Sequence, residues 1–308
     1  MRIVFFGTPS FSVPSLVKLL DSGEKVIAVV TQPDKRKGRS SVPFPPPVKE
    51  LALSKGLKIL QPVKIKEPSF LIELSNMKPE IIVVVAFGKI LSSEILKLPP
   101  FGCVNVHASL LPEYRGAAPI QWAIINGGKK TGITTMLMDE GLDTGDILLQ
   151  EEVEIADTDN AETLGKRLAE TGASLLIKTI EGLRDGTIKP IPQIGTPSYA
   201  PTFKKEDGKI DWSKTAREIF NFVRGMYPWP GVYCYLNMER IKITKVRVLE
   251  GFGKPGRIEK DREKEFIVGT GEGLISITEL QPEGKRPMSA ADFLHGRRIK
   301  EGTFFDET

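Results

Sequence analysis

Short runs of valine and isoleucine alternate with stretches of helical periodicity through the first half of the chain. This alternation restricts the possible folds more than any other feature of the sequence. Strands of continuous β-branched residues are typical of parallel sheets whose two faces are covered by helices. The pattern therefore predicts a Rossmann-like, doubly wound α/β sheet. The predicted strands occupy residues 2–7, 24–31, 57–60, 80–87 and 102–108. The predicted helices occupy residues 12–23, 46–56 and 69–77.

The end of this first domain has a different pattern from its beginning. Residues 132–155 read as two strands joined by an acidic, glycine-containing turn, which favours an antiparallel addition to the sheet. A long amphipathic helix is expected at about 160–184. We therefore predict a first domain over residues 1–188.

The character of the sequence changes after Gly186. Residues 189–203 contain four prolines and no helical period, which predicts a linker, taken as residues 189–206. A helical pattern and then short strands at even spacing follow, which predicts a small OB-like β-barrel over residues 207–308. The helix is expected at 215–226, and the strands at 232–236, 240–249, 256–260, 265–271 and 274–280.

Composition excludes several classes of protein. The only cysteines, Cys103 and Cys234, are too few for a disulfide framework or a cysteine-based metal site. No apolar run reaches the roughly 20 residues that span a membrane. The start of the chain lacks the charged flank and cleavage site of a signal peptide, so we expect a cytoplasmic protein. The net charge of +4 is mild, so any polyanion must be bound by local basic patches.

Two polar residues stand at the end of the predicted strand 102–108. Residues two apart in a strand share a face, so Asn105 and His107 point the same way. Open α/β sheets bind ligands at the carboxyl ends of their parallel strands, which favours a functional site over a buried core histidine. The second histidine, His295, is far away in the sequence and no metal-binding cluster is near, so no metal is predicted. Ser109 is not predicted to be a nucleophile, because the sequence around it lacks the nucleophile-elbow motif.

The acidic turn at 139–146 carries four carboxylates. It has two interpretations: a solvated turn, or a loop whose aspartate orients His107 and favours its charged form. Its glycines allow close backbone approach, and it follows a strand that could pair beside residues 102–108. The carboxylates belong to Asp139, Glu140, Asp143 and Asp146.

Two segments of the chain resemble the folate-dependent formyltransferases. They are NVHASLLPEYRGAAPIQWAI (105–124) and MDEGLDTGDIL (138–148). The resemblance implies 10-formyltetrahydrofolate as formyl donor, no metal, and catalysis by Asn105, His107 and Asp143. An amine would attack the formyl carbon, Asn105 and a protonated His107 would stabilise the oxyanion, and Asp143 would hold the imidazolium. The residues implied to line the folate pocket are Phe87, Gly88, Ile90, Leu91, Ser109, Leu110, Leu111 and Pro112.

Three further segments resemble the formyltransferases that act on methionyl-tRNA. They are FFGTPSFSVPSL (5–16), TQPDKRKGRSSVPFPPPVK (31–49) and KIDW followed by VRGMYPWPGVY (209–233). The resemblance implies transfer to initiator methionyl-tRNA, a role in translation initiation, and a monomer. The alternatives are a sugar-nucleotide formyltransferase and a catalytically idle tRNA-binding protein. This family often has Lys at the position of Thr202, and whether Lys204 or Lys205 replaces it is left open.

Two basic segments are candidates for binding the tRNA. The first has four cations within five residues, where the chain leaves a predicted parallel strand beside the expected site. The second places its charges largely in alternation with apolar residues. A solvated loop and ordinary strand alternation are the simpler interpretations. The candidate tRNA-binding residues are Lys35, Arg36, Lys37, Arg39, Arg240, Lys242, Lys245 and Arg247.

Overall fold

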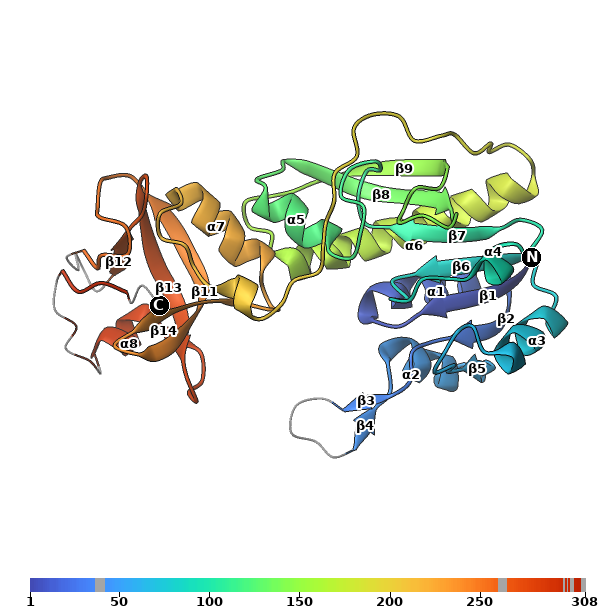
Figure 1. The fold of residues 1–308 in the computed structure, drawn as a ribbon, viewed down its shortest axis with the longest axis horizontal. Coiled ribbons are helices and arrows are strands. Elements are labelled where there is room, and N and C mark those ends of the chain that lie inside the picture. Colours follow the sequence, from blue (N-terminus) through green and yellow to red (C-terminus); the bar gives the residue numbers. More distant parts are fainter. Residues whose placement is uncertain (37–41, 260–264, 296, 298, 300–301, 306–308) are drawn as a thin grey trace. The chain divides into compact units, whose positions relative to one another are not determined.

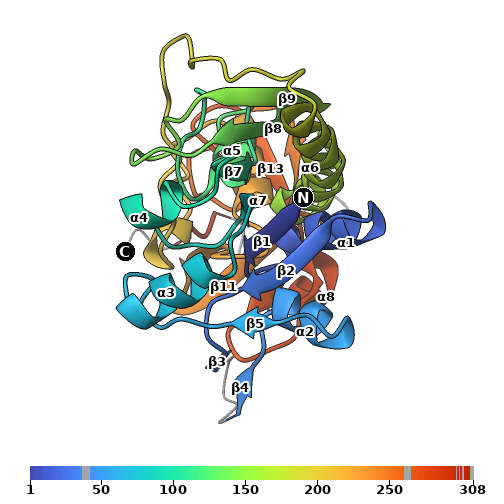
Figure 2. The same ribbon diagram turned by 90° about the vertical axis from the view of Figure 1, so that its right-hand side faces the viewer.

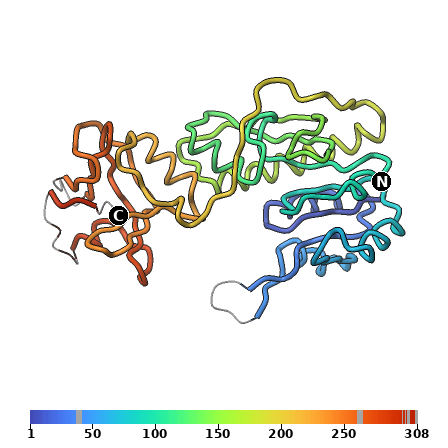
Figure 3. The backbone as a smooth tube through the Cα atoms, in the orientation of Figure 1, coloured from blue at the N-terminus to red at the C-terminus, as the bar shows by residue number. Residues whose placement is uncertain are grey.

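The computed structural model describes residues 1–36, 42–259, 265–295, 297, 299 and 302–305 (Figure 3). The chain divides into two compact units, each treated separately below. The first comprises Met1–Pro119, Lys130–Glu154 and Gly165–Pro201; the second comprises Ile120–Lys129, Ile155–Leu164 and Thr202–Thr308. The simpler domain division at 188 and 207 stays a prediction. Among the described residues, no helix has the length and apolarity needed to cross a membrane.

The first unit is built on a seven-stranded sheet with the order β5-β2-β1-β6-β7-β8-β9. Neighbouring strands from β5 to β7 are parallel, whereas β8 and β9 are antiparallel additions at one edge. Both features confirm the predicted fold. The strands are β1 (Arg2–Gly7), β2 (Lys25–Val30), β5 (Ile59–Leu60), β6 (Ile81–Val85), β7 (Cys103–His107), β8 (Lys130–Leu137) and β9 (Ile147–Glu154).

Helices cover both faces of this sheet because its central strands are apolar on both sides. Figure 2 shows α1 and α6 on one face and α3 and α4 on the other. Phe70 of α3 and Ile95 of α4 join Phe6 and Val84 of the sheet in one buried cluster. The helices are α1 (Val13–Asp21), α2 (Pro47–Ser54), α3 (Pro68–Asn76), α4 (Ser93–Leu96) and α6 (Ala161–Arg184), with a 3₁₀ turn η1 (Ser10–Ser12).

The second unit contains a curled antiparallel sheet with the order β10-β11-β13-β12, and β14 pairs with β13 (Figure 1). It is the half-barrel form of the small β-domain that the sequence predicts. Its strands are β10 (Val232–Leu236), β11 (Glu239–Leu249), β12 (Phe266–Gly269), β13 (Leu274–Pro282) and β14 (Met288–Ser289). Its helices are α5 (Pro119–Ile125), α7 (Ala216–Gly225) and α8 (Ala290–His295), with a 3₁₀ turn η2 (Glu206–Gly208).

One predicted strand of the second unit is wrong. Within the described part of 256–260, Arg257 and Ile258 form only isolated bridges, to Phe304 and Val268.

The helix α7 begins at a capping box. The Glu218 amide donates to the Thr215 hydroxyl at 3.2 Å, and the Thr215 amide donates to the Glu218 carboxylate at 2.9 Å.

Candidate active site

The strand β7 presents two polar side chains on the face of the sheet covered by α3 and α4. Asn105 pairs in register with Val84, and Val84 belongs to the buried cluster on that face. Val106 points the other way, because a Cβ added at Gly172 of α6 would lie 2.9 Å from its Cγ1. His107 is only 6% exposed. The period of two along the strand therefore brings Asn105 and His107 together.

Asp143 meets both side chains from the loop between β8 and β9. Its Oδ2 lies 3.6 Å from His107 Nδ1, and its Oδ1 accepts a long hydrogen bond of 3.5 Å from Asn105 Nδ2. The Gly116 amide donates to Oδ2 at 2.8 Å and sets the direction of the carboxylate. The distance to His107 is that of an ion pair and is too long for a good hydrogen bond. The structure thus brings all three predicted catalytic residues together.

The second nitrogen of the His107 ring also faces an acceptor. His107 Nε2 lies 3.0 Å from the carbonyl oxygen of Tyr114. Because a carbonyl only accepts, Nε2 carries the proton in this contact. The Nδ1 atom faces the carboxylate of Asp143, so only the doubly protonated imidazolium donates toward both neighbours. The arrangement is suited to holding a positive charge on the ring.

The other three carboxylates of the acidic turn have different environments. Asp139 caps its own loop, accepting from the Thr144 hydroxyl at 2.7 Å and from the Gly141 amide at 3.0 Å. Asp146 is exposed, and Glu140 lines a cavity described below. Among these four residues, only Asp143 contacts His107.

The segment that follows β7 folds into a tightly bonded turn. The Ser109 side chain is fully buried, and its hydroxyl donates to the Glu113 carbonyl at 2.5 Å. The Thr134 hydroxyl donates to the Ser109 carbonyl and accepts from the Leu111 amide, at 2.7 and 3.1 Å. The Leu111–Pro112 peptide is cis. Two of the predicted folate-pocket residues, Ser109 and Leu111, therefore pack inside the turn.

The other predicted folate-pocket segment follows β6, which neighbours β7 in the sheet. Phe87 packs edge-on against Phe6, with ring centres 5.1 Å apart, and its carbonyl accepts from Gln32 Nε2 at 2.8 Å. Ile90 is 80% exposed, whereas Leu91 is buried. This segment is thus anchored through Phe87, and the Ile90 side chain beside it is exposed.

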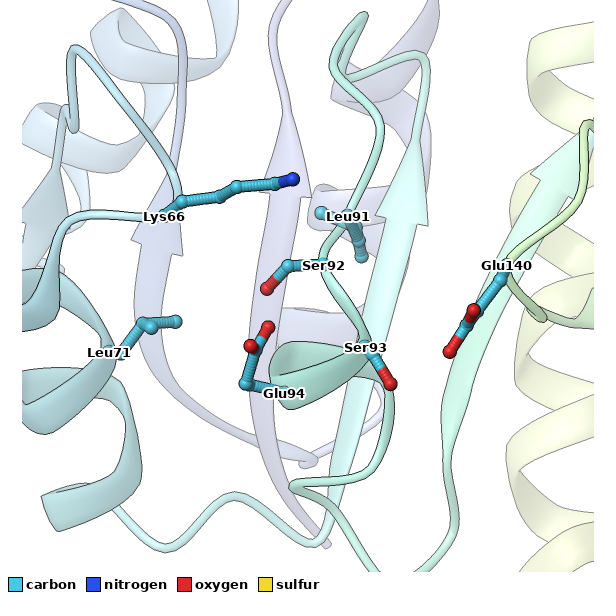
Figure 4. A pocket seen from close by; sticks show the side chains of 7 residues that line it. All are labelled: Lys66, Leu71, Leu91, Ser92, Ser93, Glu94 and Glu140. Atoms are coloured by element: carbon cyan, nitrogen blue, oxygen red, sulfur yellow. The ribbon is translucent and has the colours of Figure 1, made fainter.

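Leu91 lines a cavity of about 350 Å³ (Figure 4). The cavity lies on the same face of the sheet as Asn105 and His107, because Leu91 and Cys103 of β7 share one buried cluster. Figure 4 shows polar groups from the start of α4 and from the acidic turn around it. Its lining residues are Lys66, Leu71, Leu91, Ser92, Ser93, Glu94 and Glu140.

The first basic segment is only partly described by the structure. Lys35 and Arg36 form the short strand β3 (Lys35–Arg36), which pairs with β4 (Pro43–Phe44), and both are exposed. Lys35 Nζ donates to Gln32 Oε1 at 2.7 Å. The other two candidates, Lys37 and Arg39, lie outside the described residues.

The four basic candidates of β11 lie on one side of that strand because the strand has a bulge. Ile243 and Val246 are both buried, although residues three positions apart in a regular strand point to opposite faces. The register shifts around Lys245, which restores both to the inner face. The basic residues left on the outer side are Arg240, Lys242, Lys245 and Arg247.

These four residues differ in how far their charges are neutralised. Lys245 Nζ lies 3.0 Å from the Glu279 carboxylate, and Arg247 pairs with Glu265. The Arg240 guanidinium instead stacks over the Tyr233 ring, 3.9 Å from its centre. The side of β11 nearest β10 is therefore the more basic part of this surface.

Sequence reasoning missed two polar residues that bond to the site. Gln193 and Ser198 lie in the stretch predicted as a linker, where proline content was the only signal. Gln193 Nε2 donates to the carbonyl of Asp143 at 2.8 Å. The Ser198 hydroxyl accepts from the Tyr114 amide at 2.8 Å. No local pattern in the sequence predicts either contact.

Comparison with known families decides the family of this chain. Residues 1–180 match the profile of the Formyl transferase family, and residues 202–298 match that of the Formyl transferase C-terminal domain. The chain belongs to the formyl transferase family. The site at the end of β7 falls within the first match.

Curated relatives of this formyl transferase are similar over nearly their whole length. One is the methionyl-tRNA formyltransferase of Thermodesulfovibrio yellowstonii, 57% identical over 300 residues, or 97% of each chain. Another is that of Pelotomaculum thermopropionicum, 51% identical over 310 residues, which covers 100% of this chain and 99% of the relative.

A solved structure of an N-formyltransferase from Helicobacter canadensis, in complex with folinic acid and dTDP-3-aminofucose, has the same fold. It aligns with a TM-score of 0.69 at 23% identity, over 92% of this chain and 99% of that one.

Proposed function

We propose that this formyl transferase moves the formyl group of 10-formyltetrahydrofolate to the amino group of methionyl initiator tRNA. The observation that carries the transfer chemistry is the position of Asp143, whose carboxylate faces both Asn105 and His107 at the end of β7. The acceptor is supported by the curated relatives, which are named for methionyl-tRNA and match over nearly the full chain.

The proposed reaction uses these three side chains and no metal. The methionyl amine attacks the formyl carbon, a C–N bond forms, and the carbonyl oxygen becomes an oxyanion. Within the described residues, Asn105 Nδ2 has only a long hydrogen bond to Asp143, so it is available to donate to that oxygen. The His107 imidazolium stabilises the same charge, and Asp143 stabilises the imidazolium. The bond to the folate nitrogen then breaks, and the proton lost by the amine passes to that nitrogen.

The proposed donor site includes the cavity beside Leu91. Its volume of about 350 Å³ lies in the range typical of small-molecule sites. A folate-type donor is also supported by the structural neighbour that was solved with folinic acid. Within the predicted pocket segments, Ile90 and Leu91 are the side chains best placed to contact the donor. Phe87, Ser109 and Leu111 are buried and would shape the pocket from behind.

The proposed tRNA contacts are the exposed basic residues of both segments. Lys35 and Arg36 are exposed on β3, and Arg240 and Lys242 lie beside aromatic side chains on β10. Lys37 and Arg39 complete the first segment as predictions. Lys204 and Lys205 are both exposed, and either is a candidate replacement for the family lysine at Thr202. We also propose that the enzyme is monomeric, acts in the cytoplasm and serves translation initiation.

One assay separates the proposal from its alternatives. The protein is incubated with 10-formyltetrahydrofolate and either methionyl initiator tRNA or an amino-sugar nucleotide. We expect formyl-methionyl-tRNA and no formylated sugar. Formylation of the sugar nucleotide alone would favour a sugar-nucleotide formyltransferase; this chain shares its fold with the Helicobacter canadensis N-formyltransferase, which was solved with dTDP-3-aminofucose. Binding of tRNA with no product from either acceptor would indicate an idle tRNA-binding protein.

A further inference from the structure

Residues 191–200, called the linker segment below, belong to the first unit and are hydrogen-bonded to the rest of it near both of their ends. At one end, Ile191 and Ile147 exchange two backbone hydrogen bonds of 2.9 and 2.8 Å. At the other end, the Arg115 amide donates to the Ser198 carbonyl at 2.8 Å, and the Ala200 amide donates to the Arg115 carbonyl at 2.7 Å. A flexible connector between domains would not form such backbone pairing, so this segment does not behave as a simple linker.

Gln193 is the residue of the linker segment with the most side-chain bonds to the site. Its Nε2 donates to the carbonyls of Asp143 and Gly145, each at 2.8 Å. Its Oε1 accepts from Arg115 Nε and Nη2, at 3.1 and 2.6 Å. Both amide protons and the amide oxygen are thus used. One side chain joins the acidic turn to the segment that follows β7.

The backbone of Asp143 needs such support. Its φ is +52°, a left-handed conformation that residues other than glycine rarely adopt. Strained backbone persists where the surrounding structure holds it in place. The bonds from Gln193 lie on both sides of Thr144 and oppose relaxation of the turn. Relaxation would move the Asp143 carboxylate away from His107.

Ser198 supports the neighbour of the other His107 ring nitrogen, Nε2. Its hydroxyl accepts from the Tyr114 amide, and the Tyr114 carbonyl lies 3.0 Å from His107 Nε2. Tyr114 also has a left-handed φ, of +56°. Both acceptors around the His107 ring therefore sit on strained backbone that the linker segment fixes.

We propose that Gln193 and Ser198, two residues of the linker segment, belong to the active site as positioning residues for His107. They do not touch the reacting atoms. They hold the Asp143 carboxylate and the Tyr114 carbonyl where the imidazolium needs them. The consequence for turnover rests on the function proposed above, whereas the effect on the His107 ring does not.

The kinetic test compares variants that separate the donor and acceptor roles of the Gln193 side-chain amide. Gln193→Ala should lower kcat on the order of 10–100-fold, the effect of a small misplacement in an active site. The KM values for donor and tRNA should stay within about twofold, because ground-state binding is untouched. Gln193→Glu keeps an acceptor for Arg115 but loses the donor to the two carbonyls, so it should resemble Gln193→Ala. Wild-type kcat in Gln193→Glu would overturn the role assigned to the amide donor.

Ser198 and Ile194 supply the matched variants. Ser198→Thr keeps a hydroxyl and should retain kcat, whereas Ser198→Ala should lose part of it. Ile194→Ala changes a neighbouring side chain that is 83% exposed and should leave kcat unchanged. Equal kcat in Ser198→Ala and Ser198→Thr would remove Ser198 from the proposal. If Gln193→Ala unfolds, Gln193→Glu and the Ser198 pair decide the matter.

A second measurement needs no activity. The chain has only two histidines, so the ring signals of His107 can be followed by NMR with those of His295 as an internal reference. Gln193→Ala should shift the His107 ring nitrogens and leave His295 unchanged. If the wild type lacks transfer activity, the proposed function fails but this test still stands. Unchanged His107 signals in Gln193→Ala would overturn the positioning role.

Discussion

The Asp143 carboxylate lies 3.6 Å from His107 Nδ1, although the two residues come from a loop and a strand that are 36 positions apart in the chain. The same carboxylate accepts from the Gly116 amide at 2.8 Å. A backbone donor thus aims one oxygen of Asp143 toward the His107 ring, and the ring's other nitrogen meets the Tyr114 carbonyl. In the proposed mechanism, the charge of Asp143 stabilises the His107 imidazolium during formyl transfer.

Replacing Asp143 by asparagine should separate its charge from its shape. Asparagine tolerates a left-handed backbone and keeps an oxygen for the Gly116 amide, so the free energy of unfolding should change by less than about 1 kcal/mol. The loss of the carboxylate charge should lower kcat on the order of 10²–10³-fold. Steady-state kinetics and denaturant unfolding measure both effects. Asp146→Asn, in the same turn but exposed, is the control, and equal kcat in the two variants would contradict the role of Asp143.

Arg240 and Arg247 should contribute unequally to tRNA binding. Arg247 is paired with Glu265, whereas the Arg240 guanidinium stacks on Tyr233, and no carboxylate pairs with it in the part of the chain that the structure describes. Arg240→Ala should therefore weaken tRNA binding by on the order of 1 kcal/mol and lessen its salt dependence. Arg247→Ala should have a smaller effect. Titration of each variant with tRNA at two salt concentrations checks this: the reverse order would contradict the ranking, and unchanged affinity in both variants would remove the β11 surface from the tRNA site.

Cys103 should be inert in the folded protein. Burial raises the pKa of its thiol from 9.0 to about 12, so at pH 8 almost none of it is the reactive thiolate. Between those two pKa values the unfolded chain loses the thiol proton first, so this group's contribution to stability falls as pH rises from 9.0 to about 12. A thiol reagent at pH 8 should therefore label Cys103 only after denaturant is added. Rapid labelling of Cys103 in the native protein would contradict its place in the β7 core.

Much of the fold follows from local pattern. The parallel strands are predicted because runs such as 81–85 are apolar on both faces, and a period of two places Asn105 beside His107. Short elements such as α4 and β14 have too few residues to show a period. The strand predicted at 256–260 is wrong because Arg257 and Ile258 pair through single bridges only.

The site is less visible in the sequence because its contacts are long-range. The acidic turn offers four carboxylates, and only the three-dimensional contact with His107, or a family resemblance, selects Asp143. Gln193 reaches the Asp143 carbonyl across 50 residues, and Ser198 reaches the Tyr114 amide across 84. Such pairs depend on how loops pack, which local propensity does not encode.

The most direct test of the account is the single-turnover rate of formyl transfer from 10-formyltetrahydrofolate to methionyl initiator tRNA by wild type and His107→Ala. The control is His295→Ala, which removes the other histidine from an exposed position on α8. We expect His107→Ala to fold and bind tRNA normally but to transfer the formyl group on the order of 10²–10³-fold more slowly. The rate for His295→Ala should equal that of the wild type. Equal rates for wild type and His107→Ala would contradict the account.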